Sequence, residues 1–156
     1  MVYRTRHFTL PELVCPHVLD AYGSRAWAWF DERLLMTIDF LRDQLNVPIY
    51  GNNYDMPAET RVKLGLQLYD ERGCRCIMCS IVQKAIKNKK IYCSAHIRFQ
   101  AFDFNVFGMA SDKVTLWLLT NYQILPFPIR VEKNRIGWTH IDLCNTGTNK
   151  VELFIP

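Results

Sequence analysis

The sequence lacks the features that mark membrane-bound, exported or disordered chains. Its 156 residues contain no apolar run of about 18 residues, the length that a membrane-spanning helix requires. The N-terminus carries Arg4, Arg6 and His7, but no apolar stretch follows them as it would in a signal peptide. Internal repeats, low-complexity segments and an interdomain linker are also missing. We therefore expect synthesis in the cytoplasm and a single domain over residues 1–156.

The sequence also lacks a large excess of either positive or negative charge. Nineteen Lys and Arg residues against 15 Asp and Glu residues leave a net charge of +4. This mild excess does not demand a nucleic-acid partner, and it suits an anionic polymer about as well. The chain is 49% hydrophobic and 13% aromatic, which argues against disorder. We expect a folded monomer that binds no nucleic acid.

Hydrophobic spacing predicts several strands interspersed with helices. Asp31 is placed to cap a long amphipathic helix over 32–45, and a Thr9–Glu12 capping box begins an earlier one. Further helices are expected after Ser24, over 80–87 and over 112–121. Strands are expected at 47–50, 91–96, 101–106, 129–132, 136–143 and 151–155. Because these elements do not alternate regularly, the prediction is an α+β fold, a small antiparallel sheet with helices packed on it.

Histidine is rare, and two of the four histidines lie in strand-like runs. His96 is followed seven residues later by Asp103, and His140 lies far downstream. A carboxylate in an apolar run is costly to bury unless it is paired or binds a metal. His, Asp and His form a natural ligand set for Zn²⁺ that leaves a fourth coordination position open, as in catalytic zinc sites. The alternative for a single strand histidine is a hydrogen-bonded core residue.

These residues carry a resemblance to a known family. The pattern Ser94-x-His96-x-x-Phe99-x-Ala101-x-Asp103 resembles the Ser-x-His-x-x-Gly-x-Ala-x-Asp signature of the zinc D-Ala-D-Ala carboxypeptidases. That family includes phage L-Ala-D-Glu endopeptidases and shares its fold with hedgehog signalling domains. Its third zinc ligand is a histidine on a late strand, the position that Trp138-Thr139-His140-Ile141-Asp142 fits. The opening 8–14 is similar to the start of small phage and prophage members.

The resemblance implies a zinc metallopeptidase, phage or prophage encoded, that cleaves peptidoglycan stem peptides. Zn²⁺ would be held by His96, Asp103 and His140. Either D-Ala-D-Ala carboxypeptidase or L-Ala-D-Glu endopeptidase activity is compatible with the motif. Since no signal peptide is visible, release or other proteins would have to bring the chain to the cell wall.

Three positions differ from the family pattern. The signature glycine is Phe99, and the acid expected three residues before the last histidine is Gly137. The arginine expected after the 47–50 strand is absent at Asn52-Asn53. Arg72 or Arg75 could supply the missing cation, and the favoured alternative for each one singly is a solvated surface charge. We expect the substrate to be contacted by four residues: Ser94, Arg72, Arg75 and Trp138.

Two carboxylates are candidates for the missing catalytic base. Asp142 shares a strand face with Trp138 and His140, so it could orient a ligand imidazole or accept a proton. If residues 133–135 form a three-residue loop, Glu132 pairs with Ile136 and lies on the same face. The alternatives are a hairpin ion pair for Glu132 and a structural hydrogen bond for Asp142.

The six cysteines allow a second metal site. Cys76-Ile-Met-Cys79 is a C-x-x-C, and Cys15, in Cys15-Pro16-His17, could add ligands to form a structural zinc site. Small buried hydrophobic residues are the alternative. His17 itself is interpreted as a surface or loop histidine.

A rival function follows from the departures at Phe99, Gly137 and Asn53. A chain that keeps its zinc but lacks the usual base would be a structural or wall-binding module. In that case we expect Phe99 to cover the open coordination position and no carboxylate to reach the metal.

Overall fold

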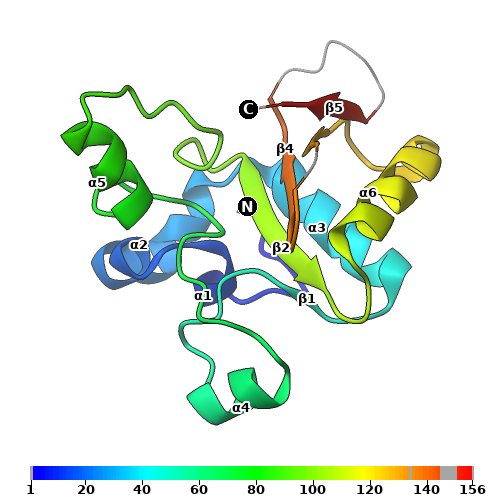
Figure 1. The fold of residues 1–156 in the computed structure, drawn as a ribbon, viewed down its shortest axis with the longest axis horizontal. Coiled ribbons are helices and arrows are strands. Elements are labelled where there is room, and N and C mark those ends of the chain that lie inside the picture. Colours follow the sequence, from blue (N-terminus) through cyan, green and yellow to red (C-terminus); the bar gives the residue numbers. More distant parts are fainter. Residues whose placement is uncertain (1, 134, 145–150, 156) are drawn as a thin grey trace.

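A computed structural model of the chain describes residues 2–133, 135–144 and 151–155 (Figure 1). The helices in these ranges are α1 (Leu10–Leu13), α2 (Pro16–Tyr22), η1 (Gly23–Trp29), α3 (Glu32–Leu45), α4 (Ala58–Lys63), α5 (Ser80–Lys87), α6 (Ser111–Thr120) and η2 (Tyr122–Ile124). The strands are β1 (Ile49–Tyr50), β2 (Ala101–Val106), β3 (Arg130–Glu132), β4 (Thr139–Asp142) and β5 (Glu152–Phe154). The α+β class expected from the sequence is confirmed.

Within the described residues, five strands form one sheet in the order β1-β2-β4-β3-β5. The pairs β1–β2, β2–β4 and β3–β4 are antiparallel, but β5 lies parallel to β3. The sheet is therefore mixed, and the expectation of an antiparallel sheet is wrong at this edge. The chain reaches β5 from β4 without forming a hairpin, so the last strand is free to run alongside β3 in the same direction.

The pleat of the sheet separates a core face from a second face. Phe102 on β2 lies opposite Ile141 on β4, which lies opposite Val131 on β3, and all three are at most 1% exposed. Neighbouring residues along each strand point the other way. The next row therefore places Asp103 opposite His140 on the second face.

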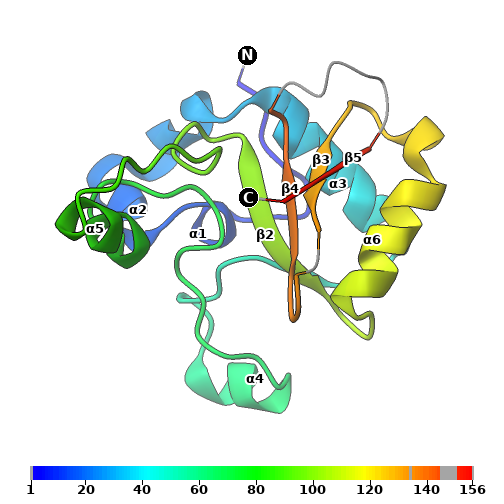
Figure 2. The same cartoon turned by 45° about the horizontal axis from the view of Figure 1, so that its top comes forward.

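Helix α3 supplies much of the core on the far side of the sheet. The Asp31 side chain accepts a hydrogen bond from the Arg33 N–H at 3.1 Å, which caps the helix as the sequence predicts. Its leucines and isoleucine at helical spacing are at most 1% exposed: Leu34, Leu35, Ile38 and Leu41. Figures 1 and 2 show α3 behind the sheet and α6 beside it. The second face is left uncovered by these helices.

Two expected elements differ in the structure, and one helix was not expected. Residues 91–94 have no regular structure and 95–99 form turns, so the strand expected over 91–96 is wrong. The helix expected after Ser24 is the 3-10 helix η1, and α4 lies where the sequence predicts no helix. None of the helices within the described ranges combines the length and apolar character that crossing a membrane requires.

Candidate metal centre

The residues His96, Asp103 and His140 converge on the second face of the sheet, as the sequence predicts. Asp103 and His140 face each other across β2 and β4, and the turn at 95–99 brings His96 to them. The Nε2 atom of His96 lies 3.3 Å from both His140 Nδ1 and Asp103 Oδ2. His140 Nδ1 lies 2.6 Å from Asp103 Oδ1. The three residues are 2–7% exposed, so the cluster is buried.

These separations fit a tetrahedral metal ion. Zinc bonds of about 2.0–2.1 Å to nitrogen and oxygen place the ligand atoms roughly 3.3 Å apart. The separations of His96 Nε2 from His140 Nδ1 and from Asp103 Oδ2 equal this value, and His140 Nδ1 lies 2.6 Å from the other carboxylate oxygen, Asp103 Oδ1. The donor set therefore has both the chemistry and the spacing to hold Zn²⁺.

The second nitrogen of each imidazole is also fixed. His96 Nδ1 lies 2.7 Å from the Gly73 carbonyl, so it carries a hydrogen and donates it, which leaves the Nε2 lone pair facing the cluster. His140 Nε2 lies 3.3 Å from Asp142 Oδ2. Outer acceptors of this kind orient metal-ligating histidines and set their tautomers.

The electrostatics of the cluster favour a cation at its centre. Burial lowers the pKa of His96, which favours the neutral ring. The neutral ring then presents a lone pair to an oxygen of Asp103, and two acceptors face each other. Burial would raise the pKa of Asp103, but the neighbouring histidines hold it well below its usual range. Burial opposes charge on His140, yet its contacts with Asp103 and Asp142 raise its pKa to about 9. A metal ion would take the place of this proton.

Asp142 is held on two sides. Arg130 binds it through two hydrogen bonds of 2.8 and 2.9 Å, and the Cys144 N–H donates to it at 2.8 Å. Burial would raise its pKa, but His140 and Arg130 keep it well below the usual range of a carboxyl group. These contacts fit the orienting role that the sequence allowed for Asp142.

Glu132 lies on the same face as the cluster, but by a different register than expected. Since Val131 pairs with Ile141, continuing the register by one residue places Glu132 opposite His140. The expected pairing with Ile136 is wrong because the connection between β3 and β4 is longer than three residues. Glu132 is 7% exposed and forms an ion pair with Arg135, the alternative that the sequence offered.

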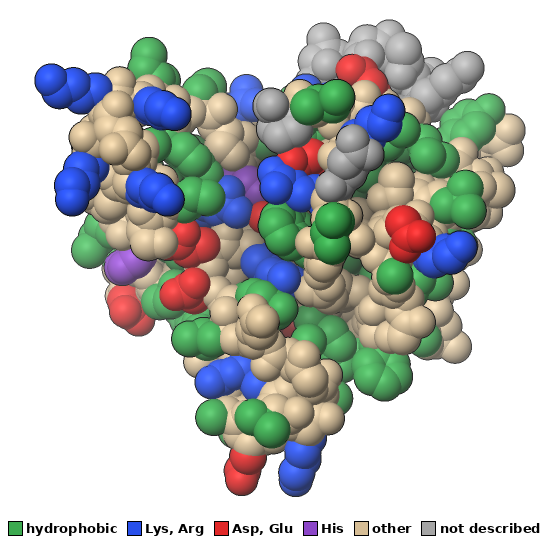
Figure 3. All heavy atoms as spheres, in the orientation of Figure 1, with side chains coloured by type: hydrophobic (Ala, Val, Ile, Leu, Met, Phe, Trp, Pro, Cys, Tyr) green, Lys and Arg blue, Asp and Glu red, His purple; other side chains and the backbone are tan. Residues whose placement is uncertain are grey.

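The cluster opens onto a cavity of 690 Å³. Figure 3 shows this face hollowed near its centre, with basic side chains and a histidine inside the hollow. Four arginines line the cavity: Arg75, Arg98, Arg130 and Arg135. Glu132, Asp142, Trp138 and the ring of Phe154 also line it, and that ring lies 5.8 Å from the ring of His140.

Three of the four expected substrate-binding residues line this cavity: Ser94, Arg75 and Trp138. Arg75 donates to Asp103 Oδ2 at 2.8 Å and to the Tyr92 hydroxyl at 2.8 Å, so it reaches the cluster itself. Arg72 instead bonds Asn105, and its guanidinium lies 3.3 Å from the ring centre of Tyr69. It lines a neighbouring cavity of 260 Å³, which Arg75, Asp103 and Trp138 share.

The departures at Phe99 and Gly137 have structural explanations. Phe99 has a φ of 57°, the left-handed conformation that favours glycine, and its ring packs on Trp29 and Phe30 at 5.4 and 5.1 Å. It does not line the 690 Å³ cavity, so the expectation that it covers the coordination position is wrong. Gly137 has a φ of 93°, which an acidic side chain would adopt only with strain.

The asparagines that replace the expected arginine are structural. Asn52 donates to the Val14 carbonyl and accepts from the Arg72 N–H, both at 2.7 Å. Asn53 accepts from the Tyr69 N–H, also at 2.7 Å. Both asparagines are 1% exposed, and they fix the loop that carries the two arginine candidates.

A second group of potential ligands lies away from the cavity. The Sγ atoms of Cys15, Cys76 and Cys79 lie with a ring nitrogen of His17 within 4.8 Å of one another. The sequence suggested the three cysteines and the Cys15-Pro16-His17 segment, whereas His17 itself was interpreted as a surface or loop histidine; it lies half-buried in α2. Its spacing in Cys15-Pro16-His17 was the available signal. Arg98 and Arg130, by contrast, are isolated arginines whose place in the cavity no motif marked.

Comparisons with protein-family models, with curated proteins and with solved structures give no match for this chain. The geometry of the ligand cluster and its cavity therefore carries the functional argument.

Proposed function

We propose that the chain is a zinc metallopeptidase that cleaves peptidoglycan stem peptides, of the D-Ala-D-Ala carboxypeptidase or L-Ala-D-Glu endopeptidase type. The observation that carries this proposal is the convergence of His96, Asp103 and His140 beside a cavity rich in arginine. The sequence resemblance supports the substrate class and a hedgehog/DD-peptidase-like fold, phage or prophage encoded.

Zinc held by His96, Asp103 and His140 would polarise a scissile carbonyl and acidify water. The chain contributes the orientation of these ligands. Gly73 fixes the ring of His96, while Asp142 and Arg130 fix the ring of His140. Burial of the cluster limits competing water, so the interactions of its charges are strengthened.

Glu132 is the proposed general base. It lies opposite His140 on the metal-binding face and lines the cavity, whereas both oxygens of Asp142 are already engaged. Glu132 also forms an ion pair with Arg135. Asp142 then acts as a positioning residue through His140.

The arginines are proposed to bind the substrate's carboxylates. Stem peptides carry D-Ala and D-Glu carboxylates, and Arg98, which is exposed and donates to Cys144 Sγ at 2.7 Å, lies at the cavity wall. Guanidinium groups bind carboxylates through paired hydrogen bonds. Trp138, with Arg135 lying 5.1 Å from its ring centre, gives an apolar wall for the peptide.

The second candidate is a wall-binding module that keeps zinc but does not cleave. The ion pair of Glu132 with Arg135 and the absence of an acid at Gly137 favour it. Two observations argue against a non-cleaving module: Phe99 does not line the cavity, and the carboxylate of Glu132 does. Enzymatic cleavage is therefore the better supported function.

Digestion of purified muropeptides with zinc-loaded protein tests the proposal, with mass spectrometry of the products. The expected result is release of D-Ala or cleavage of the L-Ala-D-Glu bond. His140→Ala should give neither product, and Glu59→Gln on α4 should leave product formation unchanged. Intact muropeptides after incubation with fully loaded wild-type protein would end the peptidase proposal, and their retention on the protein would favour the binding module.

A further inference from the structure

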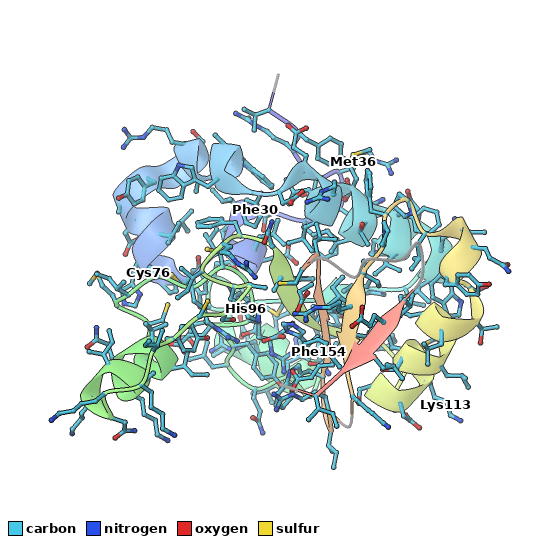
Figure 4. All side chains as sticks on the ribbon, turned by 90° about the horizontal axis from the view of Figure 1, so that it is seen from above. Phe30, Met36, Cys76, His96, Lys113 and Phe154 are labelled. Carbon is cyan, nitrogen blue, oxygen red and sulfur yellow. The ribbon has the colours of Figure 1, made fainter. Side chains whose placement is uncertain are left out.

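The four side chains Cys15, His17, Cys76 and Cys79 come from two segments far apart in the sequence. Cys15 and His17 flank the start of α2, and Cys76 and Cys79 lie in the turn before α5. One ligand atom from each lies within 4.8 Å of the other three. In Figure 4, Cys76 lies beside these helices, well apart from the labelled Phe154 near the first cluster. The group is thus distinct from the cavity site.

The thiols are arranged as metal-binding thiolates are. The Cys76 N–H donates to Cys79 Sγ, and the Met78 N–H donates to Cys76 Sγ, each at 3.3 Å. Backbone donors directed at sulfur stabilise negative charge on it. All three cysteines are free thiols, so no disulfide accounts for their proximity.

His17 provides an independent sign of a ligand. Its Nδ1 atom is buried and has no hydrogen-bond partner among the described residues. A buried ring nitrogen without a partner is costly, and a metal ion beside three thiolates would satisfy it. A fully thiol core would offer this nitrogen only weak partners.

We propose that Cys15, His17, Cys76 and Cys79 bind a second zinc ion in a closed, structural Cys₃His site. Four protein ligands with sulfur predominating match structural zinc, whereas the cavity cluster supplies three and leaves a position open. The proposal stands on these four residues alone and does not depend on the peptidase function.

The site fastens the segment that holds the first cluster together. Two backbone hydrogen bonds join the segment that carries Cys15 to the segment that carries Cys76. The Cys74 N–H donates to the Leu13 carbonyl at 2.7 Å, and the Cys15 N–H donates to the Cys74 carbonyl at 3.0 Å. The adjoining Gly73 packs so closely that an added Cβ would lie 2.0 Å from the Leu13 oxygen.

The same segment reaches two of the three ligands of the first site. The Gly73 carbonyl accepts from His96, and the Arg75 guanidinium binds Asp103. The structural zinc therefore anchors the backbone that orients two residues of the cavity cluster. Its loss should disturb that cluster without removing any of its ligands.

Metal analysis of protein purified without added zinc tests the inference. We expect two zinc ions per chain, falling to one in Cys79→Ser and in His17→Ala. The exposed Cys93→Ser is the matched control and should keep both. Two zinc ions in Cys79→Ser, or a single wild-type zinc ion that Cys79→Ser keeps and His140→Ala loses, would overturn the proposal.

Cobalt substitution gives a readout that does not need the variants of the second site to fold. The cavity cluster has no sulfur ligand, so a thiolate-to-cobalt charge-transfer absorption in the wild-type protein must come from the Cys/His group. The band should persist in His140→Ala, because this variant loses the metal ion of the cavity cluster and keeps the ligands of the Cys/His group. Absence of the band in cobalt-loaded wild-type protein would exclude the site even if every cysteine variant is insoluble.

Discussion

The two ligand clusters differ in their donors, in their access and in the structure that carries them. The cluster of His96, Asp103 and His140 offers nitrogen and oxygen beside a 690 Å³ cavity. The cluster that contains Cys76 offers mostly sulfur, and its residues line neither of the two cavities described here. An open set of three ligands suits catalysis, whereas a closed set of four suits stability. The comparison favours the proposed catalytic role for the first cluster and the proposed structural role for the second.

The clusters also differ in the elements that hold them. Asp103 and His140 face each other on paired strands, so the sheet fixes their separation. Cys15 and Cys76 lie in irregular segments between helices, and backbone hydrogen bonds between distant residues bring those segments together. Loops depend on added links for their order, and a metal ion is such a link.

The largest effect is expected from His140→Ala, which breaks the open cluster. Removing one of three ligands should abolish peptide cleavage and lower the zinc content from two ions per chain to one. Since the Cys/His group keeps its ligands, the thermal midpoint should fall far less than in Cys79→Ser. Metal analysis and calorimetry on both variants check this difference. Equal loss of stability in the two variants would contradict the division of roles.

Glu132→Gln tests whether the open cluster performs chemistry. General-base catalysis typically contributes about 10²–10⁴ in rate, so kcat should fall by that factor while both metal ions remain bound. KM should change little, because the amide keeps the shape of the side chain. Glu59→Gln, on exposed α4, is the matched control. A variant with wild-type kcat would remove Glu132 from the mechanism.

Asp142→Asn should have a smaller effect, because Asp142 acts through His140 rather than on the substrate. Partners of metal-ligating histidines typically contribute 10–100-fold to metal affinity or activity. Zinc affinity of the open cluster should fall by about that factor, as measured by competition with a chelator. Affinity at the Cys/His site should be unchanged. Arg130→Gln should show a weaker version of the same change, since Arg130 holds Asp142 at 2.8 Å.

The parts of the site that follow strand periodicity were predictable. Alternation in β2 places Asp103 on the other face of the sheet from Phe102 and Phe104. The same alternation in β4 places His140 on the face that carries Asp103. The Asp31 cap predicted the start of α3 for an equally local reason. Each of these inferences needs only neighbouring residues.

Contacts between distant segments were not predictable from local pattern. The place of His17 depends on the docking of the 73–76 segment against residues 13–15, which no periodicity encodes. The register of Glu132 depends on the length of the connection to β4 rather than on turn residues near it. The parallel pairing of β5 with β3 likewise joins two strands that are not adjacent in the sequence.

The smallest effect concerns the turn that carries His96, the one ligand of the open cluster that lies in a turn rather than on a strand. Phe99 is left-handed at φ 57°, and its ring contacts Trp29 and Phe30. Phe99→Gly and Phe99→Ala both lose these aromatic contacts, each worth about 0.5–1.5 kcal/mol. Only glycine removes the cost of the left-handed backbone, about 1–2 kcal/mol.

We therefore expect both Phe99 variants to be less stable than the wild-type chain, with Phe99→Gly more stable than Phe99→Ala by about 1 kcal/mol. Denaturant unfolding measures the difference between the two variants. Because Phe99 does not line the cavity, cleavage by folded Phe99→Gly should match the wild type. Equal stability of the two variants would show that the turn relaxes when the ring is lost. The ring contacts, rather than the sheet, would then hold the backbone beside His96.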